Sequence, residues 1–256
     1  MSDVSIENIE FTTDDGIGSH ARVGLIVLAT DFTIEHEFRQ IFNEEKTGLF
    51  TARILNEVSI TPQTLSAMEG RITDTVNLIL PGEALDVVAY GCTSASMVLG
   101  EEKVFACIRE SRPDAKCTTP ATAAFAAFNA FGAKRIAVLT PYRSDVNQIV
   151  KNYIENAGFK VPVFGSFNEE NDPTVARIDA KSISNAVDRL KTLGEFDAVF
   201  VSCTNVRLMD VVCDIEKNTG LPVTSSNHAM AWHTMRLAGD KRIMPQWGRL
   251  YKERLL

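Results

Sequence analysis

The sequence predicts an α/β fold of two similar halves, each with a parallel sheet, related by internal duplication. Short β-branched segments alternate with longer amphipathic segments along the chain, as in parallel sheets covered by helices on both faces. Residues 85–94, which end in Cys-Thr-Ser, are also similar to residues 196–205, which end in Cys-Thr-Asn. Each copy belongs to a stretch of about a hundred residues with the same element order, which favours two similar halves over an array of small units.

The first half begins with residues 23–29 (VGLIVLA), a fully apolar run that indicates a buried strand. Residues 64–80 place apolar side chains at helical spacing, which indicates an amphipathic helix. The same two patterns predict the remaining elements of this half: strands at 51–58, 86–91 and 115–118 and a helix at 94–110.

An alanine-rich helix begins at Pro120, where proline suits the first turn, and leads into the second half. The runs RIAVLT (135–140) and DAVFVS (197–202) indicate two central strands of this half. The patterns predict further strands and helices at 160–165, 221–225, 144–157, 174–193, 206–218 and 228–237.

The last strand and helix are expected to return to the first half. The first half then comprises residues 20–118 and 223–256, and the second comprises residues 119–222. Ligands of parallel α/β sheets bind beyond the carboxyl ends of the strands. The active site is therefore expected in the cleft between the halves, where both Cys-Thr turns meet.

The composition excludes several classes of function. A net charge of −7 argues against nucleic-acid or polybasic membrane-binding surfaces. No apolar run is long enough to span a bilayer, and the polar amino-terminal stretch lacks the features of a signal peptide. Five cysteines without a C-x-x-C pair and four scattered histidines predict a reduced, cytoplasmic protein without a metal site.

Cys92 and Cys203 are the strongest candidates for chemistry, because each follows a predicted buried strand and precedes a predicted helix. The positive end of a helix lowers the pKa of a thiol, and its free N–H groups suit a carboxylate. The alternative is that each cysteine is a small buried apolar residue beside helix-capping hydroxyls. Duplication of the cysteine at the same structural position favours the functional interpretation. Hydroxyl and amide side chains follow both cysteines: Thr93, Ser94, Thr204 and Asn205.

The motifs Gly-Cys-Thr-Ser (91–94), Ser-Cys-Thr-Asn (202–205) and Thr-Pro-Tyr (140–142) resemble those of the Asp/Glu racemase superfamily. The resemblance is to its maleate cis–trans isomerase and arylmalonate decarboxylase branch. Residues 29–33 and 118–123 are similar to racemase-like proteins of ectoine utilisation.

The resemblance implies an isomerase that uses no cofactor and no metal, forms a homodimer and acts on a small carboxylate or amino acid. It implies catalytic roles for Cys92 and Cys203. It also implies substrate contacts from Thr93, Ser94, Tyr142, Thr204 and Asn205.

Several reactions remain open within this resemblance. In racemases one cysteine removes the α-proton and the other protonates the opposite face, so their titrations are coupled. In maleate isomerases the first cysteine, here Cys92, attacks the double bond and later leaves. Arylmalonate decarboxylases keep only the second cysteine, so the presence of both disfavours that reaction. A non-catalytic carboxylate sensor is the alternative from another class.

Asp31 stands where maleate isomerases carry a carboxylate-binding asparagine. An aspartate there would repel a dicarboxylate but pair with an ammonium group, so the sequence favours an amine-bearing substrate or a monocarboxylate over maleate. The alternative is that Asp31 caps the helix at residues 35–42. Residues 167–177 are expected to form a loop over the cleft, where Asn171 or Asp172 can contact substrate.

Overall fold

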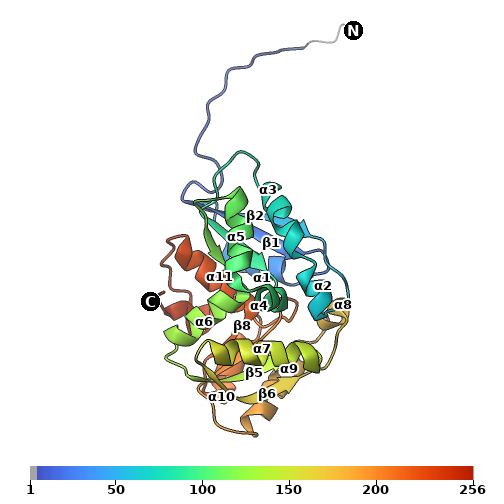
Figure 1. Ribbon diagram of the computed structural model, residues 1–256. Coiled ribbons are helices and arrows are strands. Elements are labelled where there is room, and N and C mark those ends of the chain that lie inside the picture. Colours follow the sequence, from blue (N-terminus) through green and yellow to red (C-terminus); the bar gives the residue numbers. More distant parts are fainter. Residues whose placement is uncertain (1–4, 256) are drawn as a thin grey trace.

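The computed structural model describes residues 5–255 and contains two four-stranded parallel sheets, which confirms the predicted fold class. The order is β2-β1-β3-β4 in the first sheet and β6-β5-β7-β8 in the second, so the two halves repeat one topology (Figure 1). The strands are β1 (Ala21–Leu28), β2 (Thr47–Ile54), β3 (Val87–Gly91), β4 (Lys116–Thr118), β5 (Arg135–Thr140), β6 (Lys160–Ser166), β7 (Ala198–Val201) and β8 (Val223–Ser225). The α-helices are α1 (Ile34–Ile41), α2 (Pro62–Ser66), α3 (Ile72–Asn77), α4 (Thr93–Leu99), α5 (Glu101–Ser111), α6 (Pro120–Ala130), α7 (Ser144–Asn156), α8 (Asp172–Val175), α9 (Ala180–Lys191), α10 (Val212–Thr219) and α11 (Ser226–Leu237).

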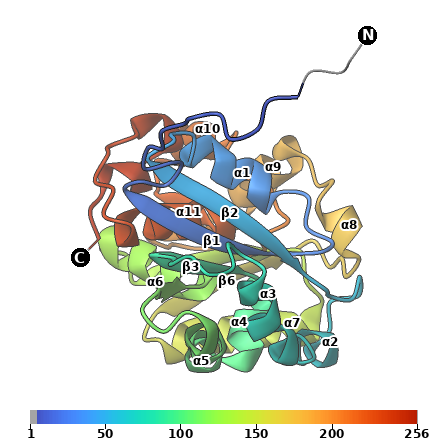
Figure 2. The ribbon, with the colours of Figure 1, turned by 90° about the horizontal axis from the view of Figure 1, so that it is seen from above.

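The central strands are buried on both faces. In the first sheet, Val23, Leu25 and Val27 face a core shared with α1 and α11. Ile26 and Val88 face the opposite core, which includes side chains of α3 and α5. Figure 2 shows these two pairs of helices on opposite sides of the first sheet. Burial on both faces explains why the strands are continuous apolar runs rather than alternating ones.

Several predicted helices are interrupted or shifted. The helix expected at 64–80 is divided into α2, a 3-10 turn and α3. The helix expected at 94–110 breaks at Gly100, whose positive φ of 84° ends α4. The helix expected at 174–193 is divided into α8 and α9, and the strand expected at 51–58 lies at 47–54. Apolar spacing stays in phase across such breaks, so periodicity alone does not reveal them.

The end of the chain is shared between the halves. Contrary to expectation, β8 does not return to the first half but pairs with β7, with Val223 opposite Val199. The helix α11 packs against α1, β3 and β4 of the first half, and it also contacts α6 and β8. The sheet pairing therefore places residues 223–225 in the second half, because their backbone groups find partners there. The other boundaries of the two halves stay a prediction.

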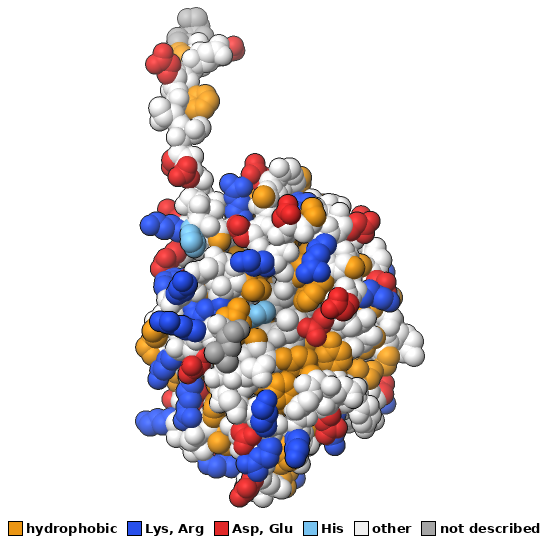
Figure 3. All heavy atoms as spheres, turned by 60° about the vertical axis from the view of Figure 1, so that its left-hand side comes forward, with side chains coloured by type: hydrophobic (Ala, Val, Ile, Leu, Met, Phe, Trp, Pro, Cys, Tyr) orange, Lys and Arg blue, Asp and Glu red, His pale blue; other side chains and the backbone are white. Residues whose placement is uncertain are grey.

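The amino-terminal segment 5–17 contains no helix or strand. Figure 3 shows it standing off the body of the molecule, and its exposed apolar side chains are Ile6, Ile9, Phe11 and Ile17. Within residues 5–255, no helix has the length and apolar character needed to cross a membrane.

The helix α11 is buried over most of its length although it carries many polar side chains. His228 Nδ1 lies 2.9 Å from the Thr224 hydroxyl, and His233 Nδ1 lies 2.8 Å from the Thr118 hydroxyl. Thr224 and Thr118 belong to the last strands of the two sheets, so α11 is bonded to both. Burial lowers the pKa of each histidine to about 4, which keeps both rings neutral at pH 7.

Glu37 on α1 is a buried carboxyl group that fixes the segment after Cys203. Its Oε1 accepts the N–H groups of Leu208 and Met209, each at 2.9 Å, and its Oε2 accepts Asn227 Nδ2 at 2.8 Å. Burial raises its pKa from 4.5 to about 7, against the opposing effect of these hydrogen bonds. Glu37 therefore connects α1, the segment before α10 and the start of α11.

We expect the Glu37→Gln variant to change how stability depends on pH. Because the pKa of Glu37 is higher in the folded state than in the unfolded state, its protonated carboxyl group contributes most to the free energy of unfolding below the unfolded-state pKa of 4.5. This contribution is lost as the pH rises to about 7. The free energy of unfolding of the variant, relative to the parent protein, should therefore increase by up to about 1.4 kcal/mol per pH unit across this window. Urea denaturation at pH 5, 6 and 7 measures the trend, and a constant difference contradicts it.

Candidate active site

A pocket lies where β3 and β7 end, and both halves contribute to its wall. It contains about 390 Å³ of empty space, counting its opening to solvent. The structure brings together most of the predicted site residues in this wall: Cys92, Thr93, Ser94, Tyr142, Cys203 and Thr204. Asp172, which was expected in the loop over the cleft, also lines it, together with residues that were not predicted: Leu28, Asn56, Glu57, Ser59, Ile60, Thr64, Leu65 and Met68.

Cys92 links the end of β3 to the start of α4, as expected. A Cβ atom on the preceding residue, Gly91, would lie 2.6 Å from the Ile26 carbonyl oxygen. Only glycine therefore lets the end of β3 approach β1 this closely. Cys92 itself is buried, and its Sγ lies 3.9 Å from the Ser94 hydroxyl oxygen.

Cys203 is held in a strained backbone conformation after β7. Its φ of 142° lies in a region that residues with a side chain rarely adopt. Its N–H donates to the Ser226 hydroxyl at 3.0 Å, and its Sγ accepts the Asn205 N–H at 3.4 Å. The expectation of a helix directly after Cys203 was wrong, because α10 begins only at Val212. The intervening segment is fixed by Glu37 instead.

Ser226 connects the two cysteine turns through one buried hydroxyl group. It accepts a hydrogen bond from Thr93 Oγ1 at 2.7 Å and another from the Cys203 N–H at 3.0 Å. This role of Ser226 was not predicted from the sequence. The sequence does mark this position, because Ser226 is aligned with Pro120 in the internal repeat and the two copies differ there.

The surroundings of both thiols favour the protonated form, which corrects the expectation of a thiolate in the free protein. Burial raises the pKa of Cys92 to about 12, and the Ala95 N–H and Ser94 hydroxyl only partly oppose it. Burial and the charge of Asp172 raise the pKa of Cys203 well above its usual range. A thiolate therefore requires a change in the pocket, such as the arrival of a ligand.

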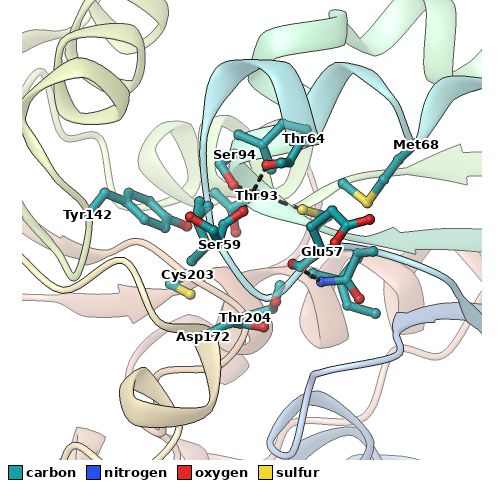
Figure 4. Close-up of a pocket in the computed structure, with 15 residues that line it drawn as sticks. Glu57, Ser59, Thr64, Met68, Thr93, Ser94, Tyr142, Asp172, Cys203 and Thr204 are labelled. Carbon is teal, nitrogen blue, oxygen red and sulfur yellow. Dashed lines mark hydrogen bonds between the residues drawn. The ribbon is translucent and has the colours of Figure 1, made fainter.

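Tyr142 supplies a neutral hydroxyl beside both cysteine turns. Burial raises its pKa well above the usual value, with a further contribution from the two thiols. Figure 4 shows its hydroxyl pointing toward the hydroxyl groups of Thr93 and Ser94, with Cys203 nearby. The arrangement therefore places a neutral hydroxyl at the pocket wall.

Asp31 and Asn205 lie behind the pocket wall and not among its lining residues. Asp31 Oδ1 accepts the N–H groups of Thr33 at 2.7 Å and Ile34 at 2.8 Å at the start of α1, and its Oδ2 is buried without a hydrogen-bond partner among residues 5–255. Asn205 Oδ1 accepts the Phe32 N–H at 2.9 Å. Neither residue lines the pocket, so a substrate contact from Asp31 or Asn205 stays a prediction.

Asp172 lies in the wall instead, in the loop region that the sequence placed over the cleft. It is 3% exposed and begins the short helix α8. Burial raises its pKa, and hydrogen bonds from Thr30 and Asn205 oppose the rise. In the chain from 5 to 255, no cluster of three or more histidine, cysteine and acidic side chains is arranged to hold a metal ion.

The chain is similar to two kinds of characterised enzyme. A family model described as arylmalonate decarboxylase matches residues 23–251. Maleate isomerase of Pseudomonas putida is 26% identical over 242 residues, which cover 90% of this chain and 96% of the relative. Arylmalonate decarboxylase of Bordetella bronchiseptica is 27% identical over 209 residues, with coverage of 80% and 86%. A solved variant of Nocardia farcinica maleate isomerase holds a covalent succinylcysteine intermediate. Its structure matches with a TM-score of 0.83 at 24% identity, over 91% and 98% of the two chains.

We expect Ser226→Ala to lower stability and Ser202→Ala to leave it unchanged or raise it. The first variant leaves the Thr93 hydroxyl and the Cys203 N–H without their buried partner, at a cost of about 1–3 kcal/mol. The Ser202 hydroxyl is buried and has no hydrogen-bond partner among residues 5–255. Chemical denaturation of the two variants tests the contrast, and equal losses contradict the role of Ser226.

Glycine at position 203 should relieve backbone strain. Glycine normally destabilises a folded chain relative to alanine, but a non-glycine residue at such a φ costs about 1–3 kcal/mol. Cys203→Gly is therefore expected to be at least as stable as Cys203→Ala, which removes the same sulfur atom. The melting temperatures of the two variants test this prediction. A clearly lower melting temperature for Cys203→Gly contradicts the inference of backbone strain.

Proposed function

The chain belongs to the arylmalonate decarboxylase family, and we propose that it is a cofactor-independent isomerase that acts on a small carboxylate through Cys92 and Cys203. The prediction of an enzyme is confirmed by its relatives. The observation that carries the proposal is that two buried thiols, from corresponding positions of the two halves, line one pocket. Hydroxyl groups of Ser94, Tyr142 and Thr204 in the same wall supply hydrogen-bond donors for a carboxylate.

Proton transfer at the α-carbon is one reaction that this geometry supports. The thiolate form of one cysteine removes the α-proton, and the electron pair of the C–H bond moves into the carboxylate as an enediolate. The thiol of the other cysteine then protonates the opposite face and becomes a thiolate. The duplicated position of the two thiols favours this reaction, because each half presents one sulfur atom.

Addition to a cis double bond is the second reaction. The thiolate of Cys92 forms a bond to one alkene carbon, and the π electrons move onto the adjacent carbon and its carboxylate. Rotation about the resulting single bond and departure of the sulfur give the trans isomer. The maleate isomerases among the relatives, and the succinylcysteine held by one of them, support this alternative.

The other inferences remain predictions. These are a racemase role in ectoine utilisation, a homodimer and a cytoplasmic location. A decarboxylase needs only the second cysteine, and a carboxylate sensor needs neither thiol. Retention of both cysteines in one pocket favours isomerisation over these two functions.

Separate Cys92→Ser and Cys203→Ser variants test the proposal, with Cys213→Ser as a matched control whose thiol is exposed and outside the pocket. Proton NMR in D₂O follows maleate, aspartate, glutamate, 2,4-diaminobutyrate and its N-acetyl forms. Each site variant should lose about a thousandfold in isomerisation rate, because each removes a proton-transfer or nucleophilic group. The control should keep its rate.

The products separate the two reactions. Loss of the α-proton signal through deuterium incorporation, with dependence on both cysteines, indicates racemisation. Fumarate formed from maleate, with the strongest dependence on Cys92, indicates cis–trans isomerisation. Undiminished turnover by both site variants overturns the proposal.

A further inference from the structure

The wall of the pocket carries negative charge without a compensating cation. Asp172 and Glu57 both line it. No lysine, arginine or histidine is found among the lining residues of the described chain. A substrate with carboxylates alone would bring further negative charge to these acids, which is unfavourable in a poorly hydrated site.

Asp172 is held rigidly from both halves of the molecule. Its N–H donates to the Val58 carbonyl at 3.3 Å, and the preceding Asn171 forms an isolated bridge with Ser59. Its own carbonyl accepts Asn205 Nδ2 at 3.3 Å. Val58 and Ser59 come from the first half, so the carboxyl group is fixed where the halves meet.

A chain of hydrogen bonds identifies the Asp172 carboxyl group as an acceptor. The Thr30 N–H donates to Asn56 Oδ1 at 3.3 Å, which fixes the orientation of that amide. Asn56 Nδ2 then donates to Thr30 Oγ1 at 2.8 Å. The remaining hydroxyl proton of Thr30 is donated to Asp172 Oδ2. Asp172 is therefore arranged as a carboxylate, ready to accept from a ligand.

Asp172 also acts on both reactive groups. Its charge contributes to the raised pKa of Cys92 and of Cys203, as does the charge of Asp31. A positive group on the ligand would offset this charge. It would thereby favour the thiolate form that both reactions in this pocket require.

We propose that the substrate carries a protonated amine and that Asp172 is the residue that pairs with it, an inference that rests on the proposed function. The substrate class is then a small amino carboxylate. Its carboxylate meets the hydroxyl donors of Ser94, Tyr142 and Thr204, and its ammonium meets Asp172. The amine-recognising acid predicted at position 31 is thus replaced by one that the fold brings to the pocket from α8.

The test compares Asp172→Asn with Glu170→Gln. Asparagine keeps an oxygen for the Thr30 hydroxyl but removes the charge. Glu170 is a matched control because it lies two residues away, pairs with Arg143 at 2.8 Å and does not line the pocket. The substrates are aspartate, glutamate and 2,4-diaminobutyrate, each beside its fully N-acetylated form, which lacks the positive charge, and maleate.

The parent protein should prefer the free amines, and Asp172→Asn should lower their kcat/KM by about a hundredfold or more. The same variant should change the N-acetylated compounds and maleate little or in the opposite direction. Glu170→Gln should behave like the parent protein with every compound. Thermal shifts with the same compounds report binding separately from turnover.

The outcomes separate this inference from the proposed function. Cysteine-dependent turnover without preference for an amine, or an equal effect of Asp172→Asn on charged and acetylated forms, overturns the role of Asp172 and leaves the isomerase intact. Amine binding that is lost in Asp172→Asn, without turnover by the parent protein, supports Asp172 and counts against the isomerase.

Discussion

The hydroxyl group of Ser226 is the point on which the geometry of the pocket depends. It accepts hydrogen bonds from the hydroxyl group of Thr93, which follows Cys92, and from the backbone N–H of Cys203, so one oxygen atom holds both cysteine turns. The two sheets are separate, and nothing in their strand pairing alone fixes the distance between the turns. The first residue of α11 fixes it, because that helix begins in the second sheet and packs against the first.

The buried polar character of α11 follows from this position. A helix that is buried on all sides is expected to be apolar all round, but α11 must also bond to the last strands of the two sheets. Thr118 and Thr224 form hydrogen bonds with the two histidines of α11, and Glu37 accepts a hydrogen bond from Asn227 of the same helix. Through Thr118 and Thr224, α11 is bonded to the last strand of each sheet. The network thus positions the segments that carry the thiols while leaving the thiols themselves uncharged.

Burial determines the reactivity of the site in the absence of ligand. Both thiols and the phenol of Tyr142 have raised pKa values, chiefly because they are removed from water. Asp172 adds negative charge to the same space. These effects favour the protonated form of both thiols in the free protein.

Local apolar patterns and an internal repeat were enough to predict the two parallel sheets, the duplicated halves and the matching positions of Cys92 and Cys203. Contacts between distant segments, by contrast, keep β8 in the second sheet, hold Asp31 at the start of α1 and bring Asp172 to the pocket. Asp31 and Asp172 are the same residue type, and each follows a polar residue. Which carboxylate meets a ligand depends on contacts between segments far apart in the chain, such as those of Asp172 with Thr30 and Val58, and no local pattern encodes them.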